Sequence, residues 1–146
     1  MTSDEGRGIR NVIFDKSIFM HEDKAKVEGY RDLIVWQKSI ALVKQIYQLT
    51  QNFPNDEKFG LVSQMRRAAV SIPSNIAEGQ ARRTTGDYVR FVSIAEGSLA
   101  ELDTQLIVAI ELSFCTRIQT KEIFLIMVEI RKMLNALRRS LMSKIN

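Results

Sequence analysis

The feature that most constrains the fold of this chain is a spacing of apolar residues that alternates between three and four positions. In one segment these positions run from Tyr88 to Ala109 in steps of four and three. Such spacing places side chains on one face of an α-helix, and no segment of any length after residue 30 shows the two-residue alternation of a β-strand. The pattern recurs in four segments joined by short connections, at about residues 30–52, 56–78, 86–114 and 120–143. The sequence therefore predicts an all-α fold, an antiparallel up-down four-helix bundle.

The second of these segments contains a proline within its apolar pattern. Pro73 lacks a backbone N–H group and crowds the preceding turn, so a kink or a break in the helix is expected there. Gly79, just past the last apolar position, is predicted to cap the C-terminus of this helix. Thr84 or Thr85 is predicted to begin the third helix, because a threonine side chain accepts a hydrogen bond from a free N–H group of the first turn.

The chain of 146 residues has the length of a single domain. Residues 29–146 are predicted to form the bundle domain. Residues 1–28 are predicted to be a loosely ordered extension, because they begin with a polar stretch and fit neither the helical nor the strand period. Acidic residues outnumber basic residues in this extension, so it is not expected to act as a basic arm.

Residues for catalysis or metal binding are scarce in this sequence. The one histidine, His21, lies in the N-terminal extension, so no Ser-His-Asp or Cys-His arrangement is expected within the helices. The sequence has no glycine-rich phosphate loop, and it lacks the Glu-x-x-His pairs that the di-iron sites of ferritin-like bundles require. We therefore predict no enzymatic activity, no cofactor and no metal site.

The sequence also bears on the compartment. The single cysteine, Cys115, cannot form an internal disulfide, which fits a reducing cytosol. No apolar run reaches the roughly 18 residues that a membrane span needs, and the N-terminus lacks the basic-then-apolar pattern of an export signal. A cytoplasmic location without membrane contact is expected.

Positive charge is the main indication of function. Lysine and arginine number 21 against 17 acidic residues, and the resulting net charge of +4 favours anionic partners. The candidate nucleic-acid contacts are six arginines: Arg82, Arg83, Arg90, Arg131, Arg138 and Arg139. No aromatic residues are interleaved with them, so they are expected to follow the phosphate backbone and the shape of a nucleic acid. The alternative is a solvated helix face, because basic residues near a helix C-terminus also suit the helix dipole.

A second set of polar residues is predicted to stabilise the bundle. A partly buried network of ion pairs and hydrogen bonds between the second and third helices would contain Arg66, Arg67, Asn75, Glu78 and Glu101. Such networks contribute conformational specificity more reliably than net stability. In the alternative, one of the two adjacent arginines faces outward and contacts phosphate, because successive helical residues point about 100° apart.

Several motifs of the chain resemble those of a known family. The stretch FPNDEKFGLVSQMRRAAVSIPSNIAEG begins at Phe53 and ends at Gly79, and the pattern continues on the third helix with Phe91, Ala95 and Glu101. These residues are similar to the bacterial four-helix bundle proteins of which some are encoded within intervening sequences of 23S ribosomal RNA genes. The resemblance covers about residues 30–143 and leaves the N-terminal extension unmatched.

The resemblance implies an up-down bundle that assembles into a homo-oligomeric ring, with a homopentamer as the expected state. Related bundles serve as accessory factors of diversity-generating retroelements, where a basic pentameric barrel associates with a reverse transcriptase and nucleic acid. Ribosomal RNA or another structured nucleic acid is therefore the expected partner. The alternatives are a self-assembling scaffold or accessory factor for a protein partner, and a relic protein of a selfish insertion.

Overall fold

The computed structural model describes residues 28–145. The extension predicted at residues 1–28 lies outside the described residues apart from Glu28. The domain boundary at residue 29 stays a prediction.

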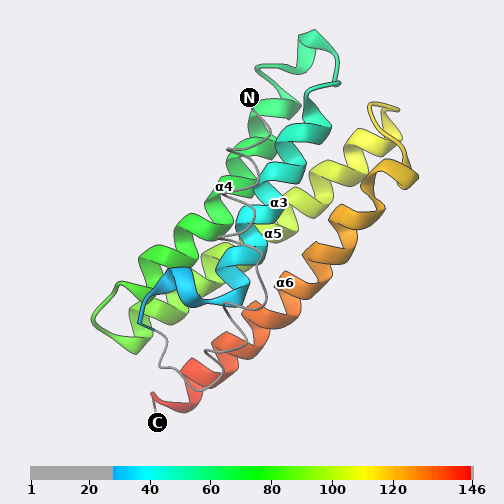
Figure 1. The fold of residues 1–146 in the computed structure, drawn as a ribbon. Helices are drawn as coiled ribbons and strands as arrows, with labels where there is room; N and C mark the ends of the chain where they lie inside the picture. Colours follow the sequence, from blue (N-terminus) through cyan, green and yellow to red (C-terminus); the bar gives the residue numbers. More distant parts are fainter. Residues whose placement is uncertain (1–27, 146) are drawn as a thin grey trace, which may run out of the picture.

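Four long α-helices make up most of the described chain, and residues 28–145 contain no strand. The helices are α3 (Ile34–Thr50), α4 (Leu61–Gln80), α5 (Thr85–Glu111) and α6 (Arg117–Ser143), and the single 3-10 turns η1 (Tyr30–Asp32) and η2 (Asn55–Glu57) precede α3 and α4. The helices lie lengthwise against one another, and the α4–α5 turn lies at the opposite end of the molecule from the α5–α6 turn (Figure 1). The predicted all-α fold with four helices is confirmed.

The apolar stripes of the four helices meet in a single core. α4 and α5 share the most extensive contact, and α5 with α6, α3 with α4, and α3 with α6 form the other packed pairs. Each helix contributes large side chains that are fully removed from solvent, among them Leu42, Ile46, Met65, Ile72, Ile76, Leu102, Leu106, Ile130 and Leu134. Burying each such side chain contributes roughly 1.5–3 kcal/mol of transfer free energy, so this core holds the helices together.

Two predictions for the second helix concern single residues, and the structure excludes a break at Pro73 and a cap at Gly79. α4 continues without a break through Pro73, which is buried in the helix interior, so the packing of α4 outweighs the loss of one backbone hydrogen bond. Gly79 does not cap the helix, because α4 continues to Gln80 and Ala81 occupies the capping position. A Cβ atom at Gly79 would instead lie 2.8 Å from the Cβ atom of Phe91 and 3.0 Å from Cδ1 of Tyr88, so this glycine lets α5 approach α4.

Capping side chains determine where the helices begin. Thr84 caps α5 as predicted, its hydroxyl accepting a hydrogen bond from the N–H of Asp87 at 3.2 Å. α6 begins at Arg117, three residues before the predicted start, because Thr116 and Gln119 form a reciprocal capping box. α4 begins only at Leu61, whose N–H donates to the carboxylate of Glu57 at 3.0 Å.

Candidate nucleic-acid interface

Three of the predicted contact residues gather at the turn between α4 and α5. Arg82 and Arg83 lie in the turn, Arg90 lies in the second turn of α5, and all three side chains are exposed. The guanidinium carbons of Arg82 and Arg90 lie 4.7 and 4.9 Å from the centroid of the Phe91 ring. Phe91 is only 7% exposed, so its buried position fixes the ring beneath the two cations. This cation–π contact orients the two guanidinium groups without neutralising their charge.

Among residues 28–145, Asp87 is the acidic residue that forms an ion pair with this group. Its carboxylate lies 3.9 Å from Nη2 of Arg90, one turn away along α5, and both side chains are largely exposed. Exposed pairs of this kind contribute about 0–1 kcal/mol, and salt screens them further. Arg90 therefore remains available to an external anion.

The predicted contacts on α6 divide into two kinds. Arg138 donates from Nε to Oε1 of Glu96 at 2.9 Å, with side chains 37% and 25% exposed, and a second hydrogen bond reaches Asn135. Arg138 therefore joins α6 to α5, and its charge is compensated within the chain. Arg131 and Arg139 are exposed and form no ion pair within residues 28–145.

The α4–α5 turn and the C-terminal end of α6 lie at the same end of the molecule (Figure 1). Arg82, Arg83, Arg90 and Arg139 thus belong to one end of the bundle, which we call the basic end. Arg131 lies eight residues before Arg139, about 12 Å further along the α6 axis. The structure brings four of the six predicted contacts to one end, leaves Arg131 beside it, and assigns Arg138 to packing between helices.

The predicted buried network between α4 and α5 is wrong. Arg67, Glu78 and Glu101 are exposed, and none of them forms an ion pair within residues 28–145. Arg66 faces α3, where its Nε donates to Oγ1 of Thr50 at 3.0 Å and its guanidinium lies 4.4 Å from the ring centroid of Tyr47. The reason is geometric, because α4 packs against both α3 and α5 and Arg66 lies on the side of α3.

Small hydroxyl side chains form the polar contact between α4 and α5 instead. The hydroxyls of Ser71 and Ser98 lie 2.8 Å apart across the helix pair. Asn75 supports Ser71 from the next turn, donating to its carbonyl oxygen at 2.7 Å and to its hydroxyl at 2.8 Å. Of the predicted network, only Asn75 takes part in this contact. The small residues that both helices carry at their shared face were the feature of the sequence that could have indicated this contact.

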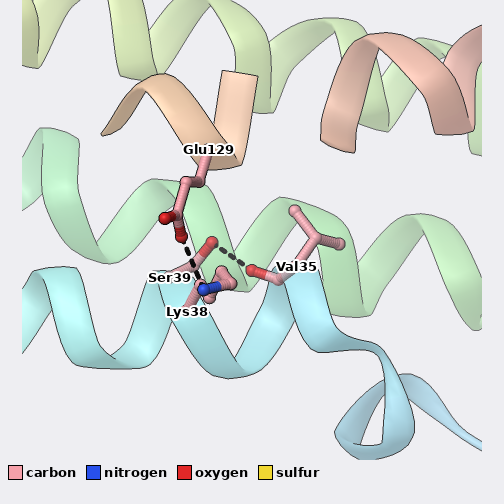
Figure 2. A network of polar contacts seen from close by, with 4 residues as sticks. All are labelled: Val35, Lys38, Ser39 and Glu129. Carbon is pink, nitrogen blue, oxygen red and sulfur yellow. Dashed lines mark hydrogen bonds and ion pairs between the residues drawn. The ribbon is translucent and has the colours of Figure 1, made fainter. Parts of the chain in front are cut away.

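A second pair of helices is joined by a polar contact that the sequence did not indicate. Lys38 of α3 extends toward Glu129 of α6, with 2.6 Å between Nζ and Oε2 (Figure 2). The neighbouring Ser39 turns its hydroxyl back onto the carbonyl of Val35 at 2.7 Å, so it satisfies itself within α3 (Figure 2). Lys38 and Glu129 are partly exposed. Their ion pair therefore helps to align α3 with α6 and does not form a reactive site.

The described residues offer little for chemistry at neutral pH. Burial raises the pKa of Tyr88 above its ordinary value of 10.0 and the pKa of Cys115 above 9.0, which keeps both groups protonated. Within residues 28–145 no cluster of three or more His, Cys, Asp or Glu side chains is placed to hold a metal ion. In the same range, no helix combines the length and the apolar character that crossing a membrane would require.

Comparisons with known proteins agree with this geometry. A family model described as 23S rRNA-intervening sequence protein matches residues 31–136. The chain is also similar to a crystal structure of a protein of unknown function from the S23 ribosomal protein family of Bacteroides thetaiotaomicron. The identity is 27% and the TM-score 0.67, over 73% of this chain and 96% of that one. A comparison with curated proteins finds no match.

Proposed function

Because the chain belongs to the 23S rRNA-intervening sequence protein family, we propose that it is a non-enzymatic, cytoplasmic protein that binds structured RNA or DNA as a homo-oligomer. The basic end would hold the nucleic acid through its phosphates. The observation that carries this proposal is the pair of guanidinium groups of Arg82 and Arg90 held over one buried ring. Two cations at a fixed spacing suit a regular array of phosphates better than freely moving side chains do.

The kind of recognition follows from what the basic end lacks. The ring that its arginines cover is that of Phe91, which is buried and cannot stack on a base, and the neighbouring Tyr88 is itself partly buried. Arginines that contact phosphates position a protein on a duplex but carry no sequence information. We therefore expect binding that depends on backbone and helical shape, with affinity that falls as salt concentration rises.

The proposal extends to the arrangement of the helices and of the copies. Short connections between long helices favour an antiparallel up-down bundle, and Figure 1 agrees with this topology.

Assembly into a ring, with five copies as the expected number, is supported by apolar surface on α6. There Ile118 is 89% exposed and Leu125 52% exposed, and both line a groove with Phe124 and Val128. A groove on one side of a subunit is suited to the head-to-tail contacts that close into rings.

The same apolar surface favours a second candidate function. Soluble monomers rarely leave residues such as Ile118 so fully exposed beside other apolar side chains. A self-assembling scaffold or accessory factor, for example to a reverse transcriptase, would use this surface for a protein partner and would not bind nucleic acid directly.

Charge reversal at the basic end separates the two candidates. Fluorescence anisotropy with a labelled RNA hairpin would compare the parent protein with the double variant R82E/R83E. The matched control is K44E/K132E, which reverses two exposed cations in the middle parts of α3 and α6. We expect the first variant to lose binding and the control to keep most of it. Equal loss in both variants would show that net charge alone is responsible, and absence of binding by the parent protein would favour the scaffold.

A further inference from the structure

A groove between α3 and the start of α4 combines positive charge with exposed aromatic surface. It measures about 560 Å³, within the roughly 300–1,000 Å³ typical of ligand sites. Its lining includes Tyr47, Lys58, Phe59, Arg66, Arg67 and Val70. We call it the Phe59 groove. It lies near the η2 end of the bundle, away from the α4–α5 turn (Figure 1).

Phe59 is the most unusual residue of this groove. Phe59 follows η2, and its side chain is 90% exposed. Phe53, which lies in the same connection between α3 and α4, is by contrast buried. A large aromatic side chain in water loses the favourable transfer free energy that burial would give. The exposed ring beside cations is therefore a surface whose burial by a ligand would be favourable.

The charges around the ring define the ligand as an anion. Lys58, Arg66 and Arg67 contribute three positive charges, and no carboxylate lines the groove. Arg66 is held in place by Thr50 and by the Tyr47 ring, so it forms a fixed part of the groove. Arg67 is exposed, and the Lys58 ammonium lies 5.6 Å from the centroid of the Phe59 ring. Both can contact an anion placed against that ring.

We propose that the Phe59 groove binds an unpaired RNA strand, with a base stacked on Phe59 and the adjoining phosphates held by Lys58 and Arg67. Aromatic side chains that stack on splayed bases, beside cations that follow the backbone, are the usual means of binding single strands. This inference rests on the proposed function and deepens it. A structured RNA offers duplex phosphates to the basic end and unpaired loop bases to this groove.

The contrast between the two sites supports the assignment. Phe91 at the basic end is buried beneath two arginines, whereas Phe59 presents its ring to solvent. Ser63 also lines the groove and offers a hydroxyl that can pair with a ribose 2′-hydroxyl. A second copy docked groove to groove would bring the same three cations against three others. Like charges across such a contact are unfavourable, which argues against self-association through this surface.

The test measures anisotropy with a fluorescein-labelled single-stranded RNA of twelve uridines and with an RNA duplex of the same length. Phe59→Ala removes the stacking ring and nothing from the core, so the variant is expected to fold. It should weaken single-strand binding roughly 5–150-fold, the range for loss of one base–aromatic contact. Phe59→Trp should restore binding. Leu112→Ala, which removes an exposed apolar side chain at the C-terminal end of α5, outside the grooves described above, is the matched control and should change nothing.

The outcomes distinguish this inference from the proposed function. Single-strand binding that depends on Phe59 while R82E/R83E leaves duplex binding intact would support the groove and refute the basic end. Duplex binding that depends on Arg82 and Arg83, with single-strand binding unchanged in Phe59→Ala, would overturn the groove alone. A change in the mass of Phe59→Ala by light scattering would assign the groove to a second copy and overturn the inference. Tighter binding of the matching DNA strand would overturn the assignment to RNA.

Discussion

Replacing Gly79 by alanine probes the close approach of α4 and α5, on which the basic end depends. A Cβ atom there would lie 2.8 Å from the Cβ atom of Phe91, 3.0 Å from Cδ1 of Tyr88 and 3.3 Å from the Tyr88 carbonyl oxygen. The Phe91 Cβ atom and the carbonyl cannot rotate away, so the two helices must separate. Overpacking of this kind costs about 1–3 kcal/mol.

The opposing effect is the better helix propensity of alanine. In a helix interior it is worth at most about 1 kcal/mol, and less at Gly79, which lies one residue from the end of α4. The expected net result is a loss of about 1–2 kcal/mol in the free energy of unfolding. The displaced Phe91 ring should also release Arg82 and Arg90, so the variant should bind RNA more weakly.

Gly97 provides the matched control in the same helix pair. It lies in the middle of α5, and a Cβ atom there would meet nothing within 4 Å. Gly97→Ala should therefore stabilise the protein by about 0.5–1 kcal/mol. Urea unfolding followed by circular dichroism measures both variants. A Gly79→Ala protein as stable as its parent, or more stable, would refute the close packing of α4 on Phe91.

Two further predictions concern the α5–α6 connection. Thr116→Ala removes half of the capping box at the start of α6 and should lower the free energy of unfolding by about 1 kcal/mol. Thr116→Ser should preserve this free energy. Urea unfolding measures both variants. Cys115 is buried, and its raised pKa means that its contribution to stability is fully present below 9.0 and is lost as pH rises through the higher folded value. Its native thiol should therefore react slowly with Ellman's reagent at pH 8 and rapidly in urea, and equal rates would contradict its burial.

The helices and the core could be predicted from the sequence because they depend on local periodicity. Val62, Met65, Ala69, Ile72 and Ile76 were assigned to one face of the second helix, and all five are buried. The periodicity is a property of each segment alone, so it does not depend on which helix packs against that segment. Helix existence and the apolar face of each helix followed from it directly.

Errors arose where the role of a residue depends on its neighbour in space. Gly79 follows an apolar stripe, as a capping glycine would, and only the nearness of Phe91 shows that it serves packing. Arg66 was paired with acids of the third helix because the sequence does not show that it faces Tyr47 and Thr50. The six arginines were also grouped by charge alone, and the partnership of Arg138 with Glu96 became visible only across two helices.

The Phe59 groove also depends on neighbours in space that the sequence does not show. In the sequence, Phe59 is one apolar residue between Lys58 and a glycine, and no motif marks it as part of a site. The fold brings Tyr47 from α3 and Arg66 and Arg67 from α4 around it, so the association of ring and charge exists only in three dimensions.

The salt dependence of RNA duplex binding tests the claim that the basic end holds phosphates. The measurement is the dissociation constant by anisotropy between about 50 and 200 mM salt, for the parent protein and for R82A/R83A. Each lost phosphate contact lowers the slope of log affinity against log salt by about 0.9, so the double variant should show a slope smaller by about 1.8. A double variant with the slope and affinity of the parent protein would contradict the claim.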